Sequence, residues 1–239
     1  PLADRTGKPL IQHVVEQVRC AHSVDRIIVA TDDQRIVEAA GSFGCEVMMT
    51  RQDHPNGTSR IAEVVGRLSN GPKLVVNVQG DEPQIEPELI DQLVECLGAD
   101  RDAPMATLAS EFAVDEDPVD PNIVKVVTAM IGGHRRAIYF SRSLIPYRRG
   151  NRDSAIGNWQ FLKHPGLYVY RRDFLLEYVK LEATPLEQAE QLEQLRALEH
   201  GIPIAVHMAD TPHHGIDTPQ QYEAFVQWYG KRLRAPKGV

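Results

Sequence analysis

This sequence of 239 residues is poor in cysteine, in basic charge and in long apolar runs. Its three cysteines, Cys20, Cys45 and Cys96, are scattered and form no C-x-x-C pair, so we expect free thiols in a reducing cytoplasm. The 26 lysines and arginines are outnumbered by 33 acids, and the net charge of −7 argues against a general nucleic-acid binder. No apolar run approaches the roughly 20 residues that a membrane-spanning helix needs. We therefore predict neither a nucleic-acid partner nor a membrane.

The basic charge that is present gathers in one stretch. Six arginines and no acid lie between Arg135 and Arg152. In an acidic protein such a stretch could bind a small anion, or it could be a solvated arginine face, and the composition favours neither.

The first half of the chain alternates strand and helix signals. This alternation predicts an α/β fold with a mostly parallel sheet flanked by helices. Expected strands cover residues 27–30, 45–49 and 74–79, and expected helices cover 9–18, 34–40, 61–68 and 87–97. We treat residues 1–239 as one domain.

The second half is less regular, with strands expected at 106–112, 124–130, 166–170 and 204–207. A Gly-Gly pair at 132–133 indicates a hairpin tip. A capping box at Thr184 predicts one helix that continues to Gly201, and Thr218 caps a final helix. The helix after Thr184 would place on one apolar face the residues Leu186, Ala189, Leu192, Leu195 and Leu198.

The most informative segment runs from Val76 to Pro83, with the sequence V-N-V-Q-G-D-E-P. A buried strand delivers the Gln79 amide and the Asp81 carboxylate at its C-terminal end, where ligands of open α/β sheets bind. Gly80 has no side chain, so a ligand or backbone can approach closely. Asp81 is a hard oxygen ligand, suited to a magnesium ion that also holds phosphates. An ordinary surface turn explains a lone G-D-E-P, but the whole octapeptide favours a site.

A second carboxylate, Asp217, lies just before the expected N-terminus of the last helix. The helix dipole favours negative charge there, which is explanation enough for a lone aspartate. Paired with Asp81, Asp217 could complete a metal site that clamps a triphosphate. Zinc is not indicated, because neither cysteine nor an H-E-x-x-H pattern accompanies the histidines at 207, 213 and 214.

Two further segments have both a binding and a structural interpretation. Residues 56–60 form a turn before a helix, and its N–H groups, with Arg60, could meet a base or a phosphate. A plain capped helix fits that turn equally well. His164 begins an expected strand, where it could donate to a carboxylate or hydroxyl of a ligand or serve as a structural hydrogen-bonding residue.

Taken together, these segments resemble the 3-deoxy-manno-octulosonate cytidylyltransferase (CMP-Kdo synthetase) family. The similar segments keep the order of that family across nearly the whole chain. They are residues 1–11, 26–32, 50–60, 76–83, 122–127, 139–142, 164–168, 192–196 and 215–219.

The resemblance implies a Rossmann-like nucleotide-diphospho-sugar transferase fold with a sugar-side, dimerising extension at about residues 106–170. It implies a cytoplasmic homodimer that transfers CMP from CTP to Kdo, or to a Kdo-like sugar acid, for lipopolysaccharide synthesis. Pyrophosphate would be released, and Mg²⁺ would be the cofactor.

The resemblance also implies roles for single residues. Asp81 and Asp217 would hold Mg²⁺ and act in catalysis with Gln79, and Gly57, Thr58 and Arg60 would lie near the nucleotide. Residues expected around the sugar acid are Gln79, Arg142, Arg149, His164, Tyr168, Glu193 and Gln194.

Two departures and two alternatives accompany this interpretation. The family opens with a strand and a basic turn that cradles the triphosphate, and we expect a chain without that segment to bind sugar acid yet turn over weakly. The stretch from Tyr147 to Trp159 also departs from the family, so the pocket could accept a Kdo variant.

There are two alternative functions. One is a sialic-acid cytidylyltransferase of the same fold, and the other is a non-catalytic nucleotide- or sugar-binding protein.

Overall fold

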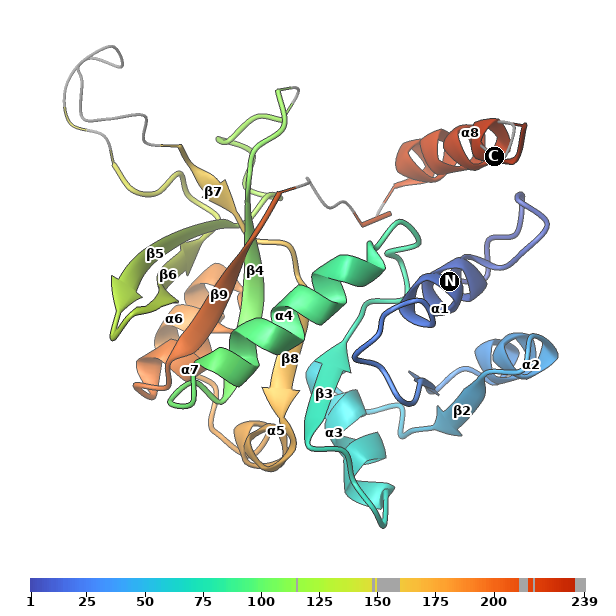
Figure 1. Ribbon diagram of the computed structural model, residues 1–239, viewed down its shortest axis with the longest axis horizontal. Coiled ribbons are helices and arrows are strands. Elements are labelled where there is room, and N and C mark those ends of the chain that lie inside the picture. Colours follow the sequence, from blue (N-terminus) through green and yellow to red (C-terminus); the bar gives the residue numbers. More distant parts are fainter. Residues whose placement is uncertain (115, 148, 150–159, 211–214, 217, 235–239) are drawn as a thin grey trace. The chain divides into compact units, whose positions relative to one another are not determined.

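The structure is a computed structural model that describes residues 1–114, 116–147, 149, 160–210, 215–216 and 218–234 (Figure 1). The chain divides into two compact units. The first consists of residues 1–64, 78–90 and 214–239, and the second consists of residues 65–77 and 91–213. Each unit is described separately.

The first unit is built on a pair of parallel strands, β1 (Ile28–Thr31) and β2 (Glu46–Met49), with Val29 opposite Val47. Helices α1 (Leu10–Val18) and α2 (Gln34–Ser42) accompany them, α3 (Gly57–Arg67) follows β2, and α8 (Pro219–Arg234) ends the described chain. The strands are short and carry β-branched residues, whereas the helices are amphipathic. One apolar cluster joins α1, α2 and the strands through Ile11, Val15, Val29, Ala40 and Cys45.

Helix α8 packs on α1 through aromatic rings. The edge of the buried His13 ring meets Phe225 at 5.1 Å and Tyr229 at 4.6 Å between ring centroids. Burial lowers the pKa of His13, which keeps the imidazole neutral in this apolar contact.

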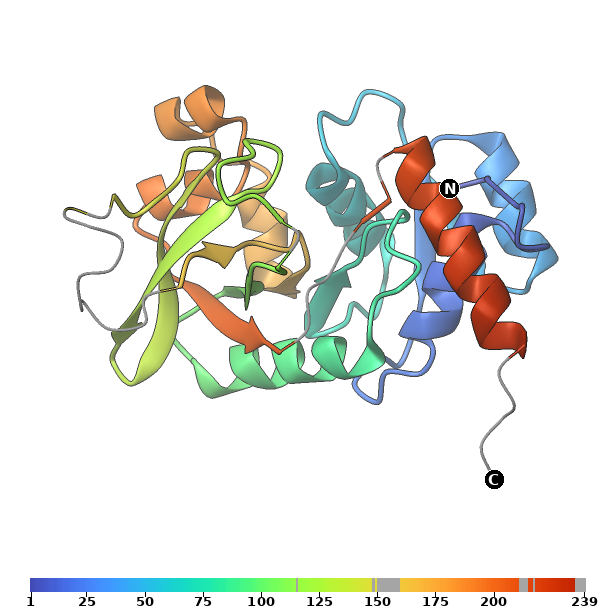
Figure 2. The ribbon, with the colours of Figure 1, turned by 90° about the horizontal axis from the view of Figure 1, so that it is seen from above.

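The second unit contains a seven-stranded sheet, whose strands are joined in the order β3-β8-β4-β7-β5-β6-β9. The strands are β3 (Leu74–Asn77), β4 (Met105–Glu111), β5 (Lys125–Ile131), β6 (His134–Ser141), β7 (Leu162–Lys163), β8 (Tyr168–Arg171) and β9 (Ile204–Ala209). The helices are α4 (Pro87–Ala99), which begins in the first unit, α5 (Arg172–Tyr178), α6 (Pro185–Glu190) and α7 (Leu195–Glu199). Figure 2 shows α4 along one side of this sheet and the α6–α7 segment on the other.

The expectation of a mostly parallel sheet is wrong for this unit. Strand β8 lies antiparallel between β3 and β4, and β5, β6 and β7 also pair antiparallel with their neighbours. Among the strands that the structure describes in this unit, only β4 and β9 form a parallel pair, with Thr107 opposite Val206. For β5 and β6 the physical reason is the hairpin that joins them at Gly132 and Gly133, both of which adopt positive φ. Because β9 also pairs with β6, the strands β4, β7, β5, β6 and β9 close into a ring.

The single helix expected from Pro185 to Gly201 is also wrong. The capping box at Thr184 is present and starts α6, but α6 ends at Glu190 because Gln191 adopts the left-handed conformation with φ of 53°. A new helix, α7, begins at Leu195. The predicted apolar face is therefore divided, and Leu186 is 39% exposed.

Smaller differences concern helix and strand ends. Helix α3 begins at Gly57, so part of the expected turn is already helical, and β3 ends at Asn77, two residues before Gln79. Within the described residues, none of the helices combines the length and the apolarity that crossing a membrane would require.

Candidate active site

The turn that follows β3 carries the residues expected to hold a metal. Asp81 is half-buried, and its backbone carbonyl accepts a hydrogen bond of 2.8 Å from the N–H of Ile216. The other expected ligand, Asp217, lies outside the described residues and directly follows Ile216 in the chain. Among the described residues no three His, Cys, Asp or Glu side chains gather as a complete metal site. The carboxylate of Asp81, the expected ligand that the structure describes, is an oxygen donor of the type that magnesium prefers.

Gly80 allows a close approach by a side chain of the first unit. A Cβ atom at this position would lie 3.2 Å from Cδ1 of Ile11, on α1. The close approach that glycine permits here is that of an apolar side chain of the protein. Gly80 lets the turn that carries Asp81 pack against the core of the first unit.

The structure brings Gln79 to the expected nucleotide-binding turn. Both amide atoms of the Gln79 side chain lie 3.8 Å from where a Cβ of Gly57 would be. Gly57 opens α3, the next residue, Thr58, is 4% exposed, and Gln79 itself is exposed. The segments around residues 57–60 and 78–83, separated in the sequence, are thus neighbours in the first unit.

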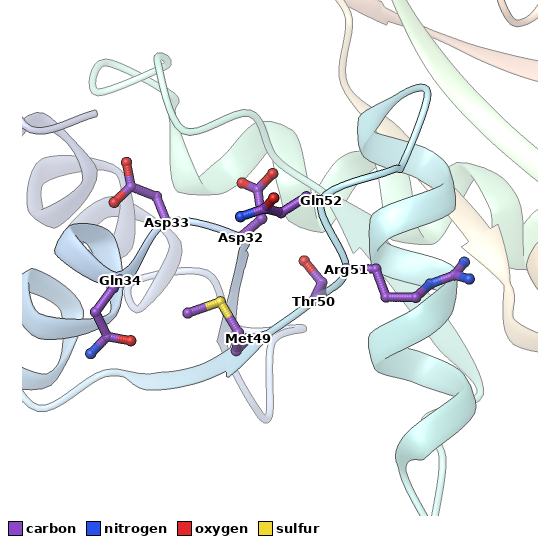
Figure 3. A pocket seen from close by; sticks show the side chains of 7 residues that line it. All are labelled: Asp32, Asp33, Gln34, Met49, Thr50, Arg51 and Gln52. Atoms are coloured by element: carbon purple, nitrogen blue, oxygen red, sulfur yellow. The ribbon is translucent and has the colours of Figure 1, made fainter.

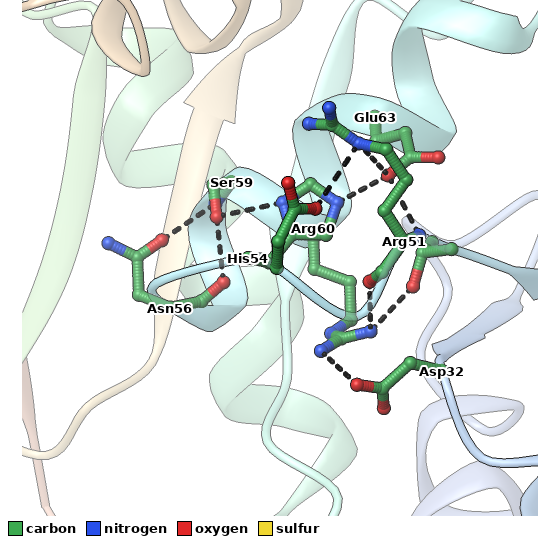
Figure 4. A network of polar contacts seen from close by, with 9 residues as sticks. Asp32, Arg51, His54, Asn56, Ser59, Arg60 and Glu63 are labelled. Carbon is green, nitrogen blue, oxygen red and sulfur yellow. Dashed lines mark hydrogen bonds and ion pairs between the residues drawn. The ribbon is translucent and has the colours of Figure 1, made fainter.

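Arg60 ties together the ends of β1 and β2 (Figure 4). Its Nη1 donates to the Thr50 hydroxyl at 2.6 Å and to the Arg51 carbonyl at 3.3 Å, while Nη2 donates to Asp32 Oδ2 at 3.1 Å. The Arg60 side chain is 19% exposed, so this ion pair is partly shielded from water. A planar guanidinium can donate to three acceptors that lie in different directions. Arg60, which was expected near the nucleotide, therefore fixes the shape of the loop after β2.

The N-terminus of α3 is capped by its own side chains, as Figure 4 shows. The Asn56 Oδ1 atom accepts the Ser59 N–H at 2.9 Å, and the Ser59 hydroxyl donates to the Asn56 carbonyl at 2.9 Å. His54 Nδ1 lies 3.1 Å from the Ser59 hydroxyl, and its Nε2 contacts Glu63. The plain capped helix that the sequence left open is therefore present, and it holds Thr58 and Arg60 in place.

A pocket of about 590 Å³ opens at the carboxyl ends of β1 and β2 (Figure 3). Ligands of parallel strands bind at such ends. The lining residues are Asp32, Asp33, Gln34, Met49, Thr50, Arg51 and Gln52. Three of them, Asp32, Thr50 and Arg51, are the Arg60 partners described above.

In the second unit, His164 and Tyr168 belong to one aromatic cluster. The His164 ring meets Phe140 edge-on at 4.8 Å and lies 5.4 Å from Tyr168, and Tyr168 stacks on Tyr170 at 5.8 Å. Although His164 keeps some exposed surface, burial of its ring lowers its pKa to about 3, so the imidazole is neutral. Burial also raises the pKa of Tyr168 well above its usual value, so that residue is a neutral phenol.

The break between α6 and α7 carries Glu193 and Gln194. The Tyr178 hydroxyl donates to the Glu193 carbonyl at 2.7 Å, which ties this segment to α5. Gln194 is 5% exposed, and its Nε2 donates to no described residue. A buried amide donor without an acceptor costs about 1 to 3 kcal/mol, and an oxygen-rich ligand would supply that acceptor.

The two arginines expected at the sugar differ in their surroundings. Arg142 donates through its guanidinium to the carbonyls of Glu190 at 2.8 Å, Pro121 at 3.1 Å and Gln191 at 3.4 Å. Its own N–H donates to the Glu190 carboxylate at 2.9 Å. Arg142 thus holds the end of α6 in place, whereas Arg149 is exposed.

Sequence reasoning missed the roles of two polar residues in this region. The Glu190 carboxylate accepts the Ser141 hydroxyl at 2.6 Å and joins β6 to α6. Thr107, fully buried on β4, lies 2.8 Å from His164 Nε2. The only signal for Thr107 was a polar residue within an apolar strand, and a single such residue does not identify its partner.

The chain was compared with known proteins. A family model described as cytidylyltransferase matches residues 1–204. The 3-deoxy-manno-octulosonate cytidylyltransferases of Geobacter sulfurreducens and Syntrophobacter fumaroxidans are both 47% identical to it. These alignments cover 95% of this chain and 91% and 88% of the relatives.

Two solved structures resemble it to different degrees. A structure of CMP:2-keto-3-deoxy-manno-octonic acid synthetase complexed with CTP is 39% identical, has a TM-score of 0.88, and covers 98% of this chain and 92% of that one. A 4-diphosphocytidyl-2C-methyl-D-erythritol synthase from Anaerococcus prevotii, at 12% identity, TM-score 0.57 and coverages of 95% and 90%, shares only the fold.

The fold and the matched family model define a class, that of the cytidylyltransferases with the α/β nucleotide-sugar transferase fold. Within this class, the chain belongs to the 3-deoxy-manno-octulosonate cytidylyltransferase family. The family resemblance seen in the sequence is confirmed.

Proposed function

We propose that this protein transfers the CMP group of CTP to Kdo, or to a closely similar sugar acid, with release of pyrophosphate. The product is the activated sugar acid needed for lipopolysaccharide synthesis. The observation that carries this proposal is the 47% identity, over 95% of the chain, to 3-deoxy-manno-octulosonate cytidylyltransferases. The solved relative in complex with CTP supports the choice of nucleotide.

The alternatives are less well supported. Eight relatives between 42% and 49% identical all act, by name, on 3-deoxy-manno-octulosonate, which favours Kdo over sialic acid as the acceptor. A non-catalytic binding protein would not need a carboxylate in the turn after β3, yet Asp81 is there.

In the reaction, the anomeric hydroxyl oxygen of the sugar acid attacks the α-phosphorus of CTP. The bond from that phosphorus to the bridging oxygen breaks, pyrophosphate leaves with the electron pair, and the hydroxyl proton passes to solvent. Little covalent chemistry is left for the protein, so catalysis depends on positioning and on charge neutralisation.

On the nucleotide side, the proposed contacts belong to the first unit. The Gly57–Thr58 turn and the pocket beside Arg60 would receive the nucleoside. The exposed Arg51 at the pocket rim, whose Nε lies 3.6 Å from Asp53 and from Glu63, would donate to an acceptor group of the base. Asp81 and Asp217 would hold magnesium, which, when bound, neutralises charge on the phosphates. Carboxylate oxygens fit this ion, and the Ile216–Asp81 hydrogen bond supports the pairing of the two aspartates.

On the sugar side, the proposed contacts belong to the second unit and include Arg142, Arg149, His164, Tyr168, Glu193 and Gln194. The buried Gln194 Nε2 supports this assignment because it awaits an acceptor such as a hydroxyl or carboxylate oxygen. An exposed arginine such as Arg149 can bind both oxygens of a carboxylate. Gln79, beside Gly57, would act with Asp81.

Three finer expectations belong to the same proposal. The core would be Rossmann-like, the protein would act in the cytoplasm, and residues 106–170 would form a dimerising extension. The exposed apolar side chains of Met130, Ile131 and Ile138 on the β5–β6 hairpin, 61%, 45% and 52% exposed, support a homodimer. Sedimentation at micromolar concentration tests this, and a clean monomer would count against it.

The enzymatic proposal is tested by measuring pyrophosphate release from CTP with Mg²⁺ and Kdo. Parallel reactions contain sialic acid, 8-amino Kdo or no sugar, and a further one contains excess chelator. We expect release only with Kdo or its amino variant and only with metal. The absence of sugar-dependent release with all three acids would overturn the proposal.

A further inference from the structure

The side chain of Thr107 makes two hydrogen bonds that settle where the proton of His164 lies. Its hydroxyl is 2.7 Å from the Leu167 carbonyl and 2.8 Å from His164 Nε2. A carbonyl can only accept, and a hydroxyl has one proton to donate. That proton goes to Leu167, so the Thr107 oxygen must accept a hydrogen bond from His164 Nε2–H.

The other ring nitrogen, Nδ1, is therefore the acceptor. A neutral imidazole carries one N–H, and the low pKa of His164, about 3, means that a second proton is absent at neutral pH. Among the described residues no hydrogen bond engages Nδ1. It is also not one of the fully buried polar atoms that lack a partner, so solvent or a ligand can reach it.

The ring is held so that it presents Nδ1 in one direction. The backbone N–H of His164 donates to the Val124 carbonyl at 2.8 Å, and Phe140 packs edge-on against the ring. Thr107 is 0% exposed on β4, a strand paired on both edges, so its hydroxyl cannot move away without breaking the bond to Leu167.

We propose that Thr107 is a positioning residue that locks His164 in the Nε2–H tautomer, so that Nδ1 accepts a hydrogen bond from a hydroxyl or ammonium group of the sugar acid. A sugar carboxylate, which can only accept, is excluded from this nitrogen and is left to the arginines. The inference rests on the proposed function for its ligand, but the tautomer is a property of the free protein. The fixed tautomer makes His164 selective for a sugar that carries a hydrogen-bond donor at the position facing Nδ1.

The tautomer is tested without turnover by long-range ¹H–¹⁵N NMR of the ligand-free protein at pH 7, with His164→Gln used to assign the resonance. We expect Nε2 to be protonated and Nδ1 to be unprotonated. Thr107→Ser keeps the hydroxyl and should keep this pattern, whereas the isosteric Thr107→Val should give a mixture of tautomers. A protonated Nδ1 in the wild type, or an unchanged pattern in Thr107→Val, would overturn the proposal.

The ligand contact is tested by adding Kdo alone to the same sample, which should shift the Nδ1 resonance as it becomes hydrogen-bonded. In kinetics, Thr107→Val should raise the KM for Kdo about tenfold while the KM for CTP stays unchanged, and Thr107→Ser should restore it. An unmoved Nδ1 at saturating Kdo, or an equal rise in both KM values, would contradict the proposal.

A panel of mono-deoxy Kdo analogues identifies the donor group. For one analogue, kcat/KM relative to Kdo should fall with the wild-type enzyme. The fall should be much smaller with Thr107→Val, because that variant has already lost the hydrogen bond between His164 Nδ1 and the missing hydroxyl. Equal losses in both proteins for every analogue would count against His164 as the acceptor. If no acid supports pyrophosphate release while the tautomer is as expected and Kdo shifts Nδ1, the proposed reaction fails and this inference stands.

Discussion

The backbone N–H of Ile216 donates to the carbonyl oxygen of Asp81 at 2.8 Å, and this bond joins the turn after β3 to the segment that leads into α8. It links two segments that lie more than a hundred residues apart in the sequence. The turn that carries Asp81 is therefore held in part by a backbone hydrogen bond that does not involve the Asp81 carboxylate. A substitution there should affect chemistry more than folding.

We expect Asp81→Asn to lower the rate of pyrophosphate release more than tenfold, equivalent to roughly 1.4 kcal/mol of barrier. The amide keeps the shape of the side chain but removes the charge that a magnesium ion requires. Initial rates over a range of Mg²⁺ concentrations measure the effect. Asp173→Asn is the matched control, because Asp173 is 92% exposed on α5, and its rate should stay at the wild-type level. Unchanged turnover in Asp81→Asn would remove this residue from the metal site.

Local sequence signals predicted much of the first unit. The expected helices at residues 9–18 and 34–40 and the expected strand at 27–30 are each encoded within about ten residues, and all three are present as α1, α2 and β1. The glycine of the G-D-E-P turn was identified, but its partner, Ile11, was not. A glycine signals a close approach, whereas the atom that approaches is fixed by packing between distant segments.

The second unit shows what local signals cannot predict. Nothing in the sequence around Gln191 distinguishes it from a good helix residue, yet its left-handed conformation divides the expected helix and buries Gln194. The hydrogen bond from the Tyr178 hydroxyl to the Glu193 carbonyl stabilises this break. In the same way, the tautomer of His164 depends on Thr107, 57 residues earlier in the chain.

We expect Gly80→Ala to destabilise the protein by about 1 kcal/mol, because the new Cβ would meet Ile11 Cδ1 at 3.2 Å. Ile11→Val removes that methyl group, so the penalty of Gly80→Ala should vanish in the Ile11→Val background. Urea denaturation measures all four proteins of the cycle. Gly98→Ala is the control, because no atom lies within 4 Å of its Cβ position near the end of α4, and it should be neutral or stabilising. Simple additivity of the two substitutions would refute the contact.

Arg60→Lys should raise the KM for CTP about tenfold, equivalent to roughly 1.4 kcal/mol. One ammonium group cannot reach Thr50, the Arg51 carbonyl and Asp32 together, so the loop that lines the pocket would lose its shape. Steady-state kinetics with CTP varied at saturating Kdo measure this change. Arg35→Lys serves as the control because Arg35 is 77% exposed and contacts only its neighbour Asp33 among the described residues. A larger change in the KM for Kdo than for CTP would show that the loop is not on the nucleotide side.

The pH dependence of stability should show the contribution of one buried ion pair. The Arg136 guanidinium, which donates to both oxygens of Asp100 at 2.7 Å, holds the pKa of that carboxyl below its usual value. The contribution of this ion pair to the stability of the fold is therefore complete above the ordinary aspartate pKa of about 4. It is lost as the pH falls through the lowered pKa of Asp100. We expect Asp100→Asn to cost about 2 kcal/mol at pH 7 and progressively less from pH 5 towards pH 2. Asp102, 85% exposed and 3.4 Å from the same guanidinium, is the control, and Asp102→Asn should change stability by less than about 0.5 kcal/mol. Urea denaturation across this pH range decides the matter, because a penalty for Asp100→Asn that is constant with pH would mean that its charge does not stabilise the fold.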